Sequence, residues 1–174
     1  VVPALEKHKI GHQFQVTASF KSAKTSVERT SYSGNFNWDY GREDDHVMAF
    51  GNINYGDVDG KTYLDKNLIH VRYIRYRVLG KVSLETFVQR EQNDLASLVN
   101  RSLVGAGLSR LFGEEDDKFT YHLMGGIMLE SEKHITDTSL NRENTRFTVS
   151  NQLSWDVFTG SRFTLTNYIQ PKVS

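Results

Sequence analysis

The sequence predicts an all-β protein, an antiparallel up-and-down transmembrane β-barrel. Apolar and polar residues alternate one for one in segment after segment, as they do in 14–20 and in 31–40. Successive side chains of a strand point to opposite faces, so each segment builds a ribbon with one apolar and one polar face. The apolar side is rich in aromatic residues, and the polar side carries small and charged groups. This is the pattern of a membrane barrel that is apolar outside and polar inside.

Most of the alternating segments are longer than the strand of about 5–6 residues that is usual in soluble domains. Clusters of Gly, Asp, Asn and Ser separate them, and these are the residues that turns require. The predicted strands are 11–22, 29–41, 46–56, 67–79, 82–91, 98–112, 118–131, 144–157 and 161–170. The segment 91–97 is the one place where a short helical turn competes with a strand.

The connections between these strands alternate in length, which is the second observation that favours a barrel. The short ones are 41–45, 80–81, 113–117 and 158–161, and the longer, polar ones are 22–28, 57–66, 92–97 and 132–143. Outer-membrane barrels have short periplasmic turns and longer external loops. The alternation therefore places the N-terminus in the periplasm and the longer loops outside the cell.

The strand count sets a further expectation. Single-chain bacterial barrels have an even number of strands, and the chain ends at 170–174 without the aromatic C-terminal residue that such barrels commonly carry. Either one of the nine segments is miscounted or, as we prefer, one barrel domain extends over residues 1–174 and lacks one or more closing C-terminal strands. The complete barrel would have about ten or more strands.

Composition limits the other classes of function. The chain has no cysteine, so neither disulfides nor thiolate metal sites are available. Lys+Arg and Asp+Glu balance at 21 each, which gives no electrostatic case for nucleic acid. No apolar run approaches the roughly 20 residues of a transmembrane helix. A soluble β-sandwich also alternates and remains the structural alternative, which the strand lengths and the loop pattern disfavour.

The polar face is expected to line the lumen of the barrel. Charged groups there would pair across the interior as a network, because an eight-stranded interior is just wide enough for side chains to fill. A lumen lined by charge would alternatively serve as a permeation path. The predicted network is Lys21, Asp39, His70, Arg72, Glu85, His122, Glu130, Arg146 and Asp156.

Aromatic residues near the strand ends are expected to form the girdle that marks the two membrane interfaces. The predicted girdle is Trp38, Tyr40, Tyr55, Phe112 and Trp155.

Two segments break the alternation. The arginines change parity between Arg72 and Arg75, which predicts a β-bulge, or else Arg75 and Arg77 snorkelling at the interface. A basic patch for lipid phosphate is a sharper alternative for the same arginines. In 101–110, Gly105 and Gly107 share a face and leave space for a bulky neighbour or a bend.

A search for catalytic or metal-binding groups finds no strong signal. No histidine stands in a close His-x-Ser arrangement of the kind a lipid hydrolase would use. His134 with Asp137, and Asp44 with Asp45 and His46, are weak cation candidates, and the acidic stretch 114–117 matches no EF-hand loop. We therefore predict no catalytic residues, no metal and no cofactor.

The segments 67–77, 101–108 and 125–132 carry a family likeness, in a layout that extends over about 12–170. In them the chain resembles the salt-induced outer-membrane protein family of bacteria. The resemblance implies an outer-membrane β-barrel without assigned enzymatic residues, and the missing C-terminal strand is where this chain departs from it.

The function expected from these observations is structural. We predict a scaffold barrel in the outer membrane of a Gram-negative bacterium, as the membrane-anchored part of an envelope assembly rather than an enzyme. Its partners would be outer-membrane lipid, lipopolysaccharide and other envelope proteins. A porin-like channel or transporter for small solutes is the alternative, and a soluble ligand-binding β-barrel is a further one.

Overall fold

The computed structural model describes residues 10–24, 26–93, 98–113, 118–134, 139, 141–158 and 161–173. In this part of the chain it is all-β, with nine antiparallel strands that form one sheet in sequence order. The strands are β1 (Gly11–Lys24), β2 (Glu28–Gly41), β3 (Asp45–Val58), β4 (Lys61–Leu79), β5 (Val82–Asn93), β6 (Leu98–Phe112), β7 (Phe119–His134), β8 (Arg142–Phe158) and β9 (Ser161–Ile169). All nine predicted strands are confirmed, most of them slightly longer than predicted.

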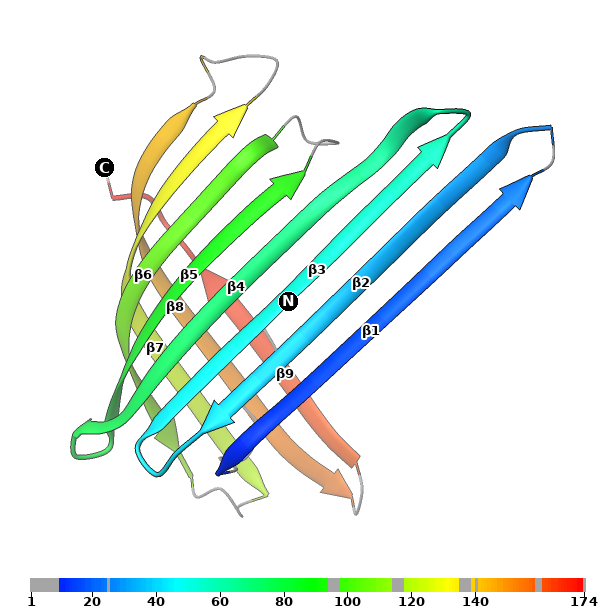
Figure 1. Ribbon diagram of the computed structural model, residues 1–174. Coiled ribbons are helices and arrows are strands. Elements are labelled where there is room, and N and C mark those ends of the chain that lie inside the picture. Colours follow the sequence, from blue (N-terminus) through cyan, green and yellow to red (C-terminus); the bar gives the residue numbers. More distant parts are fainter. Residues whose placement is uncertain are drawn as a thin grey trace.

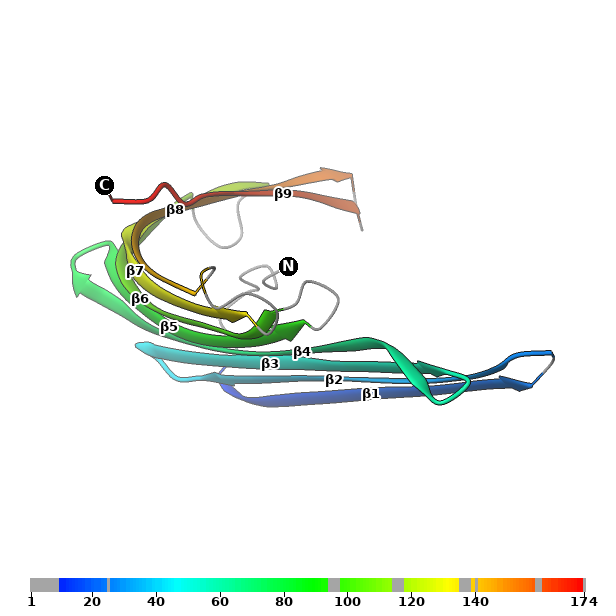
Figure 2. The same ribbon diagram turned by 90° about the horizontal axis from the view of Figure 1, so that it is seen from above.

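The sheet is curled but open (Figures 1 and 2). Strands β1 to β4 lie nearly in one plane, whereas β5 to β8 curl round so that β9 returns above the concave side. Among the described residues β1 pairs only with β2 and β9 only with β8, so the predicted closure into a barrel is not found. No helix in the described part of the chain is long and apolar enough to cross a membrane.

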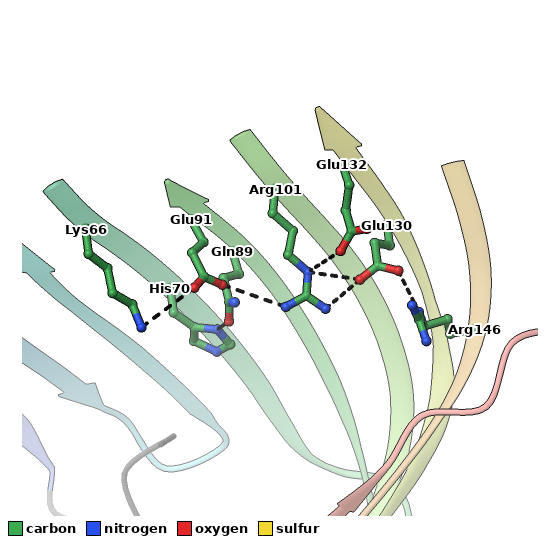
Figure 3. Close-up of polar contacts among 8 residues, drawn as sticks. All are labelled: Lys66, His70, Gln89, Glu91, Arg101, Glu130, Glu132 and Arg146. Carbon is green, nitrogen blue, oxygen red and sulfur yellow. Dashed lines mark hydrogen bonds and ion pairs between the residues drawn. The ribbon is translucent and has the colours of Figure 1, made fainter. Parts of the chain in front are cut away.

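The two faces of the sheet have opposite character, as the alternation predicts. We call the side that carries Glu85 and Glu130 the polar face and the side that carries Val104 and Ile127 the apolar face. The buried residues lie on the polar face, among them Glu85 and Glu130, which are 1% and 2% exposed. Many large hydrophobic side chains of the apolar face are exposed, for example Phe20 at 70%. The polar face is the concave one, as the side chains in Figure 3 show.

The connection at 57–66 is a correction to the predicted loop pattern. Strands β3 and β4 approach so closely that only Asp59 and Gly60 lie between them, with φ angles of 50° and 74°. Two successive residues with positive φ form the type I′ turn that suits a two-residue hairpin, and Asp-Gly is a preferred pair for it. The expected long external loop is absent here, so long and short connections do not strictly take turns.

The parity change between Arg72 and Arg75 is not caused by a bulge at that point, because the register of β4 with β5 is regular from Lys66 to Arg75 and the two arginines lie on opposite faces. The pairing of β4 with β5 shifts between Arg75 and Leu79, and Arg77 has a φ of 57°. Neither arginine is a free cation at an interface. Arg75 pairs with Asp45 at 2.6 Å, and Arg77 pairs with Asp44 in the turn before β3. Both arginines therefore tie β4 to the start of β3.

Candidate functional site

The most concentrated chemistry of the molecule is a row of charged side chains across the polar face of β4 to β8 (Figure 3). Each strand contributes from the half that lies toward the end of β5 and the start of β6, so that cations and carboxylates alternate along the row. We call this set the charged row. It consists of Lys66, Glu91, Arg101, Glu130, Glu132 and Arg146.

Arg101 is the centre of the row and joins three carboxylates. Its guanidinium donates through Nε to Glu130 Oε1 at 2.9 Å. The same group lies 3.7 Å from Glu91 and 3.3 Å from Glu132. Lys66 extends the row to β4, with its Nζ 4.0 Å from Glu91 Oε1.

Glu130 is the most enclosed member of the row, since its side chain has no exposed surface. Besides Arg101, it accepts from Arg146 Nε at 2.6 Å and from Asn144 Nδ2 at 3.2 Å. A buried carboxylate is tolerated only where it is paired and hydrogen-bonded. Both Glu130 oxygens therefore have the donors that burial demands.

A second cluster lies nearer the middle of the polar face, around Glu85. Its carboxylate is 3.0 Å from His122 Nε2 and 3.6 Å from Arg72 Nη1. Tyr168 of β9 faces the same arginine from across the concave side. Side chains of β4 and β9, which are far apart in the sheet order, thus lie near each other on the concave side.

A stack of rings lies between these two clusters. His70 packs between Phe50 and Phe87, with ring centroids 4.9 Å and 5.9 Å away, and its Nδ1 is 3.1 Å from Gln89 Oε1. The Phe87 ring covers Gly105, where a Cβ would lie 2.4 Å from Phe87 Cζ. The prediction that this glycine makes room for a bulky neighbour is confirmed.

The remaining predicted network residues form smaller groups. Asp39 bonds to His46 Nε2 at 2.7 Å, and Asp156 bonds to Arg162 at 2.6 Å and 2.9 Å. Lys21 lies exposed on β1. All nine predicted residues lie on the polar face, but they belong to separate clusters rather than to one network.

Sequence reasoning missed four members of the charged row, namely Lys66, Glu91, Arg101 and Glu132. Alternation could have placed Arg101 and Glu132 on the polar face, because each lies two residues from Leu103 or Glu130. Their mutual contact depends on register, which pairs Arg101 directly with Glu132.

The five predicted girdle residues lie near the two ends of the strands. Trp38 and Tyr40 stack with each other at the β2–β3 turn, with centroids 6.4 Å apart. Phe112 and Trp155 lie at the same end of the sheet, because β6 and β8 finish there. Tyr55 lies at the opposite end, stacked 4.8 Å from Tyr32.

The weak cation candidates have other partners where the structure describes them. Asp44 and Asp45 bind arginines, and His46 binds Asp39. Asp137, the stretch 114–117 and residues 94–97 of the suggested helical turn lie outside the described residues. Within the described part of the chain no group of three His, Asp or Glu side chains could hold a metal ion.

A family model for proteins of unknown function, DUF481, matches residues 16–173. Because the match spans nearly the whole chain, the chain belongs to this family. No curated protein and no solved structure is significantly similar to it.

Proposed function

We propose that this member of the DUF481 family forms the wall of a transmembrane β-barrel in a bacterial outer membrane, with a structural rather than a catalytic role. The observation that carries the proposal is the reversal of the two faces. Large apolar side chains lie exposed on the convex face, whereas the carboxylates Glu85 and Glu130 are buried and paired on the concave face. In water the stable arrangement would be the reverse, with the apolar side chains buried and the charged side chains exposed.

The apolar face is too large for an ordinary soluble surface. Phe14, Ile53, Ile127 and Leu129 are each more than half exposed, and they come from three different strands. Burial of apolar surface contributes about 25 cal/mol per Å², so leaving such a face in water forfeits a large stabilisation. Lipid is the environment that covers it.

A bilayer also demands that the sheet edges be satisfied. Backbone groups cannot remain unpaired in hydrocarbon, which is why only closed barrels span membranes with strands. The proposal therefore requires β1 and β9, the open edges of the described sheet, to be paired in the membrane. With the start of β1 on the periplasmic side, the end of β5 and the start of β8 would lie on the outer side of the membrane.

The interior contacts favour a filled barrel over an open pore. The charged row contains three cations and three carboxylates, so it is electrically balanced within itself. Arg72 and Tyr168 meet across the concave side. Side chains that pair with one another hold strands together and obstruct the space that a solute would need. These paired side chains therefore support a structural role for the barrel rather than a role as a channel.

One observation favours the channel alternative. The side chains of Lys66 and Arg101 are 43% and 26% exposed, so part of the charged row reaches solvent. Planar-bilayer conductance distinguishes the two roles. A structural barrel gives no stable single-channel steps, whereas steps whose ion selectivity changes in Arg101→Gln would establish a channel.

Heat-modifiability in the outer-membrane fraction tests the barrel itself, by comparing boiled and unboiled samples on a detergent gel. The wild type should migrate differently in the two samples. Leu153→Arg should abolish the difference, because an arginine on the lipid face costs about 2–4 kcal/mol at the bilayer midplane. Gln152→Arg, on the polar face of the same strand, is the matched control and should keep the shift. A wild type that is water-soluble and shows no shift contradicts the proposal.

A further inference from the structure

The apolar face has a hollow of about 660 Å³ over β4 to β8. It lies on the same half of the strands as the charged row but on the opposite side of the sheet. The floor includes Val71, Val88, Val104 and Leu129, and the polar residues along its edge include Arg90, Ser102 and Ser131.

The strand register explains why the surface is hollow here. Arg90 of β5, Ser102 of β6, Ser131 of β7 and Glu143 of β8 are consecutive partners, so they form one row across the apolar face. The two serines are small and lie between two long side chains. The next row toward the middle of the strands is Val88, Val104, Leu129 and Thr145, and it is mainly aliphatic. The result is a hollow with hydroxyl groups on one side and aliphatic groups on the other.

Cationic groups lie at the polar edge of this hollow. Arg90 is exposed, and its guanidinium donates through Nε to Asn100 Oδ1 at 3.0 Å. The two Nη groups of Arg90 take no part in this hydrogen bond. Lys133 is the register partner of Asn100 and is also exposed. The acid Glu143 lies at the far end of the row, about 14 Å from Arg90 across three strand spacings. An anionic group is therefore favoured at the Arg90 end.

We propose that this hollow binds the phosphorylated, acylated saccharide of lipopolysaccharide. A phosphate would lie between Arg90 and Lys133, saccharide and acyl hydroxyls would bond to Ser102 and Ser131, and an acyl chain would lie on the aliphatic floor. Guanidinium groups match phosphate geometry with two parallel hydrogen bonds, so Arg90 would favour a lipid that carries a phosphate group. The inference rests on the proposed function, since it requires the apolar face in lipid and this half of the strands on the outer side.

Native mass spectrometry of the full chain in detergent tests the site, with added diphosphoryl lipid A, dephosphorylated lipid A or phosphatidylglycerol as probes. Diphosphoryl lipid A should bind about tenfold more tightly than the other two. Arg90→Gln should remove about tenfold of this affinity. Arg75→Gln makes the same change at the other end of the apolar face and should leave the affinity unaltered. Ser131→Phe should fill the hollow and weaken binding, whereas Ser22→Phe on β1 should not.

The outcomes separate this inference from the proposed function. Equal retention of all three lipids, or equal losses in Arg90→Gln and Arg75→Gln, would mean a non-selective lipid belt and would overturn the site while leaving the barrel intact. Each variant is first checked for heat-modifiability, so that a loss of binding is not a loss of fold. A wild type that is not heat-modifiable would overturn the barrel and the lipid site together.

Discussion

The flat half of the sheet, β1 to β4, and the curled half, β5 to β8, share the same alternation but differ in what their polar faces carry. On β1 and β2 that face holds mostly small neutral groups such as Gln15, Ser19 and Asn35. On β5 to β8 it holds the buried carboxylates Glu85 and Glu130. The curl brings these strands round a common interior, so charges there lose water and must find partners in the protein.

Glycine placement is the second difference between the halves. Gly107 of β6 and Gly126 of β7 are direct partners on the concave side. A Cβ at Gly107 would lie 2.5 Å from the Gly125 carbonyl oxygen, and one at Gly126 would lie 2.3 Å from the Ala106 carbonyl oxygen. Side chains crowd on the inside of a bend, and glycine relieves this crowding. The crowded glycines and the two buried carboxylates therefore occur in the same half of the sheet.

The largest expected effect comes from removing a charge from the curled half. Glu130→Gln leaves Arg101 and Arg146 without their shared carboxylate and should lower the free energy of unfolding by about 3–5 kcal/mol. Asp39→Asn in the flat half is the counterpart. Its side chain is 44% exposed, so the loss should stay within about 1 kcal/mol. Urea unfolding in detergent measures both, and similar losses would remove the distinction between the halves.

A smaller effect is expected from filling the bend. Gly107→Ala should destabilise the fold by about 1–3 kcal/mol, because backbone atoms rather than flexible side chains meet the new methyl group. Gly125→Ala is the matched control, since nothing lies within 4 Å of a Cβ there. Its unfolding midpoint should be unchanged or slightly raised. If both variants unfold alike, then the glycines do not set the curl.

The smallest effect concerns pH at the β2–β3 turn of the flat half. The Arg77 guanidinium hydrogen-bonds the Asp44 carboxyl and holds its pKa below the usual value. Because the folded pKa is lowered, the stabilisation is present above the unfolded pKa and is lost as the pH falls through the folded one. The stability difference between wild type and Asp44→Asn should therefore be constant near neutral pH and fade below about pH 4. A difference that grows as the pH falls would contradict the pairing.

Much of the fold followed from alternation alone, because a two-residue period assigns each side chain to a face without knowledge of any partner. All nine strands and the faces of residues such as Phe14 and Arg146 were predictable in this way. The 57–66 connection was misjudged because the Asp59-Gly60 pair was read as part of a loop rather than as a two-residue turn.

The clusters could not be predicted, because they depend on the offset between strands. Arg101 meets Glu91 because the register of β5 with β6 makes the two residues direct partners. Likewise, the sequence shows that Gly107 and Gly126 exist, but only the register shows that they face each other. Long-range contacts of this kind need the strand offsets that local patterns do not contain.

The central claim is that the apolar face lies in lipid and the polar face in the interior. The chain contains no cysteine, so single cysteines along β7 can carry nitroxide labels in reconstituted vesicles. The account predicts that accessibility to oxygen, which concentrates in lipid, is high at Leu123, Ile127 and Leu129 and low at Met124, Met128 and Glu130, with a period of two residues. High accessibility of the apolar-face labels to a water-soluble nickel complex, without that alternation for oxygen, would contradict it.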